Sequence, residues 1–151
     1  MAAERPRPYS SFNYLVDLGG DTGDANDFKA GFQEVTGLGV EVTMQDYRAG
    51  NAKTNATMKL ATRYKVNDVT LKRGVLGTLD LTKWLNQVRN GEDARRNITI
   101  HLQSEDRSAI AMTWRLEGVQ PMKYTGPSLN GKGTDVAIEE LALSVEEIKF
   151  E

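Results

Sequence analysis

The residues best placed to bind a ligand lie in one short stretch, residues 69–91, with the sequence VTLKRGVLGTLDLTKWLNQVRNG. It begins as a strand, passes the basic pair Lys72 and Arg73 and the glycines Gly74 and Gly77, and ends as an amphipathic helix. A strand, a basic glycine-containing turn and a helix are also the outline of a phosphate-binding site. However, the stretch lacks both the Gly-Lys-Ser/Thr ending of a P-loop and the three glycines of a dinucleotide-binding turn. We therefore interpret the glycines as turn residues with positive φ, and a phosphate site is the less favoured alternative.

The other titratable residues do not predict a catalytic or metal site. His101 is the single histidine, and it alternates with Ile100 and Leu102, so it points away from the apolar face of its strand. The absence of cysteine excludes disulfides and thiol chemistry. Three acidic pairs are interpreted as solvated turn residues or as carboxylates without a second element to complete a catalytic dyad: Glu105–Asp106, Glu139–Glu140 and Glu146–Glu147. The sequence thus predicts neither an enzyme nor a bound cofactor.

The composition is that of one ordinary globular domain. The chain has 151 residues, of which 26% are charged and 39% hydrophobic, enough to bury a real core. Its formal net charge of -2 supplies no overall basic field for nucleic acid. No apolar run approaches the ~20 residues of a membrane span, and the first residues have no signal-peptide core. We expect a protein made in the cytoplasm, with no membrane anchor.

Period-two alternation predicts a mainly β domain. The clearest strands lie at 12–18, 40–45, 66–74, 98–103 and 110–116, and the last two form the strongest hairpin signal. One helix is predicted at about 79–90, and four residues on one of its faces should dock it on the sheets: Leu81, Trp84, Leu85 and Val88. Residues 136–150 fit both helix and strand. Residues 1–10 are expected to be a flexible N-terminal arm before a single domain over 11–151.

The segment 48–65 is predicted to be an extended loop, since it is long and holds few large apolar residues. It contains no acidic residue, and its basic residues are Arg48, Lys53, Lys59 and Arg63, with Lys65 at its end. Such a segment is either a solvated loop or a protruding arm that orders against a partner.

Four segments in this order resemble the tail tube proteins of contractile phages and related contractile injection systems, with the type VI secretion tube protein a more distant relative by fold. They are FNYLVDL at 12–18, FQEVTGLG at 32–39, the Leu-Lys-Arg-Gly run with Trp84 at 69–91, and VAIEELALSVEEIKF at 136–150. The sequence departs from the family at Lys59-Leu60, where Ala61-Thr62 replaces the Pro-Gly that often follows. The conformation of the loop is therefore not carried over from the family.

This resemblance implies two packed antiparallel sheets forming a barrel-like sandwich with one flanking helix, and it favours a strand at the C-terminus. It also implies a structural protein that assembles into stacked homohexameric rings, the rigid inner tube through which sheath contraction drives cargo. The implied partners are the sheath protein, baseplate and tube-initiator proteins, a tube-terminator or cap protein, and effector protein or phage DNA in the lumen. The residues expected to contact other subunits or rings are Arg48, Lys53, Lys59, Arg63, Lys72 and Arg73, with the loops at 19–27 and 126–135.

The alternative function is a β-barrel binding module for nucleic acid or a phosphorylated ligand, using Lys72, Arg73 and the basic loop. The net charge of -2 and the shortage of aromatic residues along one strand face argue against it.

Overall fold

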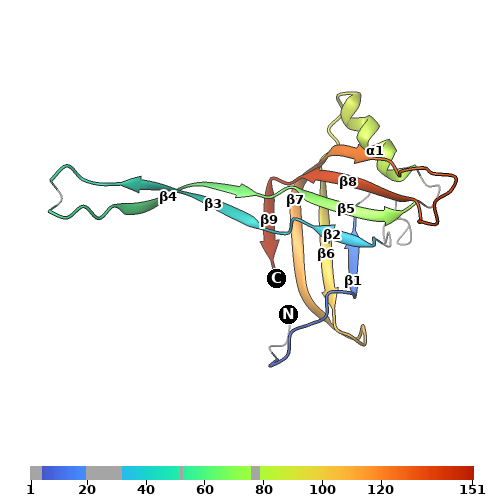
Figure 1. Cartoon of the computed structure of the whole chain (residues 1–151), viewed down its shortest axis with the longest axis horizontal. Helices are drawn as coiled ribbons and strands as arrows, with labels where there is room; N and C mark the ends of the chain where they lie inside the picture. The colour runs from blue at the N-terminus through green and yellow to red at the C-terminus, as the bar shows by residue number, and fades with distance from the viewer. Residues whose placement is uncertain (1–4, 20–31, 52, 76–78) are drawn as a thin grey trace.

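The fold is mainly β, as predicted, with one short helix in the described part of the chain (Figure 1). The computed structural model describes residues 5–19, 32–51, 53–75 and 79–151. The elements are β1 (Tyr14–Asp17), β2 (Glu34–Thr36), β3 (Val40–Tyr47), β4 (Met58–Val66), β5 (Val69–Gly74), α1 (Asp80–Arg89), β6 (Arg96–Gln103), β7 (Ile110–Thr125), β8 (Ile138–Ser144) and β9 (Glu147–Phe150).

Seven strands form one antiparallel sheet that bends along β7. The strand order is β1-β6-β7-β8-β5-β2, and β9 pairs with β7 beside this path. The first half of β7 pairs with β6 and β9, and its second half pairs with β8. The change of partner coincides with Gly118, whose φ is +64°, and with a register shift between Pro121 and Lys123. Bends of this kind let one strand serve two packed layers, and the layers cross steeply in Figure 1.

The two layers do not close into a barrel within the described residues. The edge strands are β1 and β2, and no strand pairing joins them. The hydroxyl of Tyr14 on β1 instead donates a hydrogen bond of 2.6 Å to the carbonyl of Phe32, just ahead of β2. The sandwich is therefore open along this side and is tied there by a side chain.

The hydrophobic core lies between the two layers, and the C-terminal strand β8 contributes to it. Both layers contribute side chains with at most 2% exposure: Val16, Ile98, Ile100 and Leu116 from one, and Val69, Leu71, Leu141 and Leu143 from the other. Burial of each side chain contributes about 1.5–3 kcal/mol before the entropy cost. Since β8 pairs with β5 on one side and β7 on the other, tertiary pairing overrides the helical propensity of this segment.

The helix α1 is anchored on the core by two side chains. Leu81 and Trp84 are buried, and the Trp84 indole N–H donates a hydrogen bond of 2.6 Å to the Ala94 carbonyl. Leu85 is half-buried, and Val88 packs against the core cluster. The helix is ten residues long, and no described helix has the length and hydrophobicity needed to cross a membrane.

The N-terminal segment lies against the body from Arg5 onwards, within the residues described. The Arg5 guanidinium donates hydrogen bonds of 2.6 and 3.0 Å to the Glu105 carboxylate and stacks 3.6 Å from the centre of the Tyr9 ring. The hydrogen bond from Arg5 lowers the pKa of Glu105 to about 2. A charged pair between such distant parts of the chain is not visible in the local sequence.

The strands β3 and β4 form a separate two-stranded sheet, called here the arm, which projects far from the body (Figure 1). Every residue of the arm strands is exposed except Val66 at the base. The predicted loop over 48–65 is therefore corrected: Met58–Val66 is a strand, and only residues 48–57 connect it to β3. The missed signal is the alternation of apolar and basic residues in MKLATRYKV.

Gly37 in the FQEVTGLG motif marks the point where the body passes into the arm. Its φ is +89°, a left-handed conformation that favours glycine. A Cβ at this position would lie 2.1 Å from the Asp68 carbonyl oxygen, on the segment that leads back from the arm into β5. Glycine is therefore required for the two connections at the base of the arm to lie side by side.

Replacing Gly37 by Ala should lower the free energy of unfolding by at least about 1–2 kcal/mol, because the left-handed backbone disfavours any Cβ. Gly50→Ala is the matched control, since a Cβ there meets no atom within 4 Å, and its stability should stay within about 0.5 kcal/mol of wild type. Urea unfolding measures both. Equal stability of the two variants would contradict this role for Gly37.

Candidate functional site

The candidate site is the arm, because its exposed surface is unusually apolar. Seven large hydrophobic side chains on it are 38–59% exposed: Val40, Val42, Met44, Tyr47, Met58, Leu60 and Tyr64. They make up almost half of the exposed large hydrophobic residues in the described part of the chain. An isolated two-stranded hairpin is at best marginally stable in water, so such a surface indicates a protein contact.

The arm is also basic while the rest of the chain is acidic. Residues 40–66 contain five basic residues and two acidic residues, Glu41 and Asp46, for a formal charge of +3. Because the whole chain carries -2, the remaining residues carry -5. An apolar, positively charged arm and an acidic body are complementary surfaces.

The predicted contact residues of the arm lie together on it. Lys53, Lys59 and Arg63 are exposed, and Arg48, also exposed, donates a hydrogen bond of 3.2 Å to the Thr54 carbonyl within the connection. The sequence prediction named no apolar residue of the arm as a contact residue. The alternation in β4 could have found Met58, Leu60 and Tyr64.

Lys72 lies on the outer face of β5 and is already paired within the chain. Its ammonium group lies 3.3 Å from Glu140 and 3.6 Å from Glu34, on the two strands beside β5. The hydrogen bond to Glu140 is the main cause that raises the pKa of Lys72. About a third of the side chain is exposed. Lys72 therefore crosslinks three strands at the surface of the sheet.

Arg73 does not lie at a surface, which corrects the expectation that it contacts another subunit or a solvated face. It is 2% exposed, and its Nε donates a hydrogen bond of 2.6 Å to the Glu139 carboxylate. The Tyr124 hydroxyl donates to the other oxygen of Glu139 at 2.7 Å, and this bond raises the pKa of Tyr124. The reason is the alternation of β5, since Arg73 shares the inward face with Val69 and Leu71.

These pairings remove the basis of a phosphate site in this turn. Both cations are matched by carboxylates of their own chain. Gly74 is not a turn residue of positive φ but the last residue of β5, opposite Ile138. Gly77 lies outside the described residues. The binding-module alternative thus loses Lys72 and Arg73, two of the cations on which it depended, and keeps only those of the basic segment 48–65.

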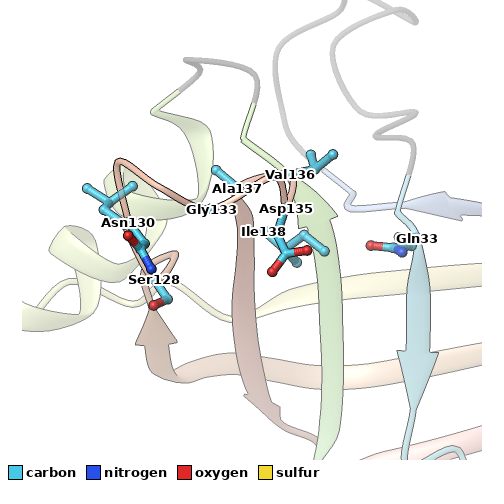
Figure 2. Close-up of a pocket in the computed structure, with 9 residues that line it drawn as sticks. Gln33, Ser128, Asn130, Gly133, Asp135, Val136, Ala137 and Ile138 are labelled. Atoms are coloured by element: carbon cyan, nitrogen blue, oxygen red, sulfur yellow. The ribbon is translucent and has the colours of Figure 1, made fainter.

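A second surface feature lies at the other end of the sheet from the arm, where an open cavity of about 680 Å³ adjoins the 126–137 loop (Figure 2). It is lined by Gln33, Ser128, Leu129, Asn130, Gly133, Asp135, Val136, Ala137 and Ile138. Leu129 and Val136 are 84% and 76% exposed. No cluster of potential metal ligands occurs in the described ranges, and one charged residue lines the cavity.

The predicted neighbour-facing loop at 19–27 lies, apart from Gly19, outside the described residues.

His101 is used structurally. Its Nδ1 lies 2.9 Å from the Thr113 hydroxyl on the adjacent strand, and both residues are at least half-buried. This is a cross-strand polar pair.

Arg73→Met should destabilise the chain by about 3–5 kcal/mol, because it leaves the Glu139 carboxylate buried without its cation. Lys72→Met on the outer face of the same strand is the matched control and should cost no more than about 1 kcal/mol. Denaturant unfolding distinguishes them. Comparable losses for the two variants would contradict the assignment of Arg73 to the interior.

The chain matches a family model over nearly its whole length. The model is T4-like virus tail tube protein gp19, and the match spans residues 10–149. No curated protein matches the chain.

Solved structures with the same fold include two chains of an extracellular contractile injection system. A chain of the PVC sheath–tube complex of an extracellular contractile injection system, in its extended state, is 24% identical, with a TM-score of 0.83 over 97% of this chain and 93% of that chain. A chain of the PVC sheath/tube terminator is 26% identical, with a TM-score of 0.81 over 99% of both chains. Hcp1 from Flavobacterium johnsoniae is 12% identical, with a TM-score of 0.58 over 91% of this chain and 93% of that protein.

The family match covers far more than half of the sequence, and its description agrees with a surface built for contact rather than for catalysis. The chain therefore belongs to the T4-like virus tail tube protein gp19 family: it is a structural tail tube protein, not an enzyme, and forms the inner tube of a phage tail or contractile injection system.

Proposed function

We propose that the chain assembles into homohexameric rings that stack into a rigid tube, and that the arm makes the contacts between copies. The observation that carries this proposal is the exposed apolar surface of the arm strands. In a monomer, a hairpin that the body does not cover is at best marginally stable and adds nothing to the stability of the fold. Covering the arm with neighbouring copies stabilises it and the assembly together.

Ring formation would also protect the open edges of the sheet. In the described structure β1 and β2 end the strand order, and β9 is paired on one side. Unpaired strand edges favour association, and a head-to-tail contact that closes on itself limits that association to a ring. The arm and the 126–137 loop lie at opposite ends of the sheet, an arrangement suited to head-to-tail contact (Figure 1).

The partners of the tube follow from the assemblies in which similar chains occur. Those assemblies are described as a sheath–tube complex, a sheath/tube terminator, a tube-terminating cap and a six-fold symmetrised baseplate. For this chain we infer contact with a sheath protein, with baseplate and tube-initiator proteins, and with a terminator or cap. Sheath contraction would drive the tube and its cargo, effector protein or phage DNA, through a target envelope.

A shortened arm tests the proposal. Met44 and Ala61 are opposite partners, so residues 45–60 can be replaced by an Asn-Gly turn, the two-residue connection that hairpins favour. The melting temperature should change little, because every removed residue of the two strands is exposed, while the variant should form no tubes. Electron microscopy and sedimentation measure assembly, with the wild-type chain as the full-length control.

Two results would contradict the proposal. One is tubes of normal length from the shortened variant. The other is wild-type protein that stays monomeric at every concentration, even when it is co-produced with baseplate proteins.

A further inference from the structure

The arm contains a bulge that divides its apolar surface. The register pairs Thr43 with Arg63 and Met44 with Ala61, which leaves Thr62 as an extra residue in β4. The Thr62 hydroxyl donates a hydrogen bond of 3.0 Å to the Thr43 carbonyl and so holds the bulge in place. An extra residue reverses which face of the hairpin the following side chains of that strand occupy.

Near the body, the apolar residues occupy one face. Directly opposed residues of a hairpin share a face, and Val40 pairs with Val66 and Val42 with Tyr64. The other face at this level holds Glu41 opposite Lys65, followed by Thr43 opposite Arg63. We call the apolar set Val40, Val42, Met44 and Tyr64 the base patch.

Beyond the bulge, the apolar residues of β4 occupy the other face. Leu60 is opposed to Gln45, and Met58 to Tyr47, so these side chains project on the side of Glu41 and Thr43. The face of the base patch now carries Asp46 opposite Lys59. We call Tyr47, Met58 and Leu60 the tip patch. Each face of the arm is therefore apolar along one half and charged along the other.

One neighbouring surface lying along the arm can cover only one of these patches. We propose that a single arm is held between two other copies of this chain, one covering the base patch and the other covering the tip patch. This inference rests on the proposed tube assembly and specifies how the arm works within it.

Copies of the chain are the fitting partners because their charge is complementary. Where a patch ends, the same face continues with a charged cross-strand pair, and the connection beyond it carries Arg48 and Lys53. The arm as a whole is +3, whereas the remainder of each copy is -5. A tube supplies many copies at once, so two of them can meet opposite faces of one arm.

Photo-crosslinking at the two arm tyrosines tests this arrangement. Tyr64 lies in the base patch and Tyr47 in the tip patch, so p-benzoylphenylalanine can replace either or both with little change of shape. A trace of the tagged variant is assembled into tubes with excess untagged wild type and irradiated. Each tagged chain then has only wild-type neighbours.

Each single replacement should give tagged dimers, and the double replacement should give tagged trimers of one variant and two wild-type chains. If the double replacement gives dimers but no trimers, one copy covers both patches, and the proposal is wrong. No crosslink from either position within tubes would overturn it too. Wild-type protein that forms no tubes would instead show that the proposed assembly itself is wrong.

Discussion

The exposed apolar side chains of the arm are the main physical constraint on this protein. Seven of them remain roughly half exposed, and completing their burial contributes about 1 kcal/mol each. The sum is several kcal/mol for every copy before the entropy cost of association. The body offers them no cover, because every residue of both arm strands except Val66 is exposed. In the proposed assembly, other copies of the chain would bury these side chains and stabilise the arm.

The body holds the base of the arm in a defined position. The arm leaves through β2 and returns through β5, and these two strands pair with each other in the sheet. Gly37 lets the outgoing and returning connections lie in contact. Further along β5, towards its end at Gly74, Arg73 and Glu139 join β5 to β8 through a buried ion pair. Such an arrangement gives a long arm a rigid origin, which an ordered tube requires.

The sequence predicted the elements whose side chains alternate clearly or whose ends carry strong signals. The hairpin of β6 and β7, the face of α1 with Leu81 and Trp84, and the end of the helix at about residue 90 follow from local patterns. Gly91 has a φ of +78°, as a helix-ending glycine requires. The strand at 138–144 was reached only through family resemblance, because its helical propensity conflicts with its pairing.

The features that the sequence analysis predicted wrongly or missed depend on strand pairing and burial, which local sequence patterns do not show. The strand β4 was predicted to be part of a loop because the segment 48–65 is long and holds few large apolar residues, and the alternation within β4 was missed. Arg73 was placed at a surface on the strength of its charge, although its phase within β5 places it inside with Leu71. The Thr62 bulge depends on the register between two strands, which a single sequence does not specify.

Hydrogen exchange of the backbone amides in β3 and β4 is the most direct test of the central claim, that other copies stabilise the arm. In the monomer these amides should exchange rapidly relative to those of β6 and β7, because an uncovered hairpin opens readily. In assembled tubes they should be protected to a similar degree as the body strands. Arm amides that are equally well protected in monomer and tube would contradict the claim.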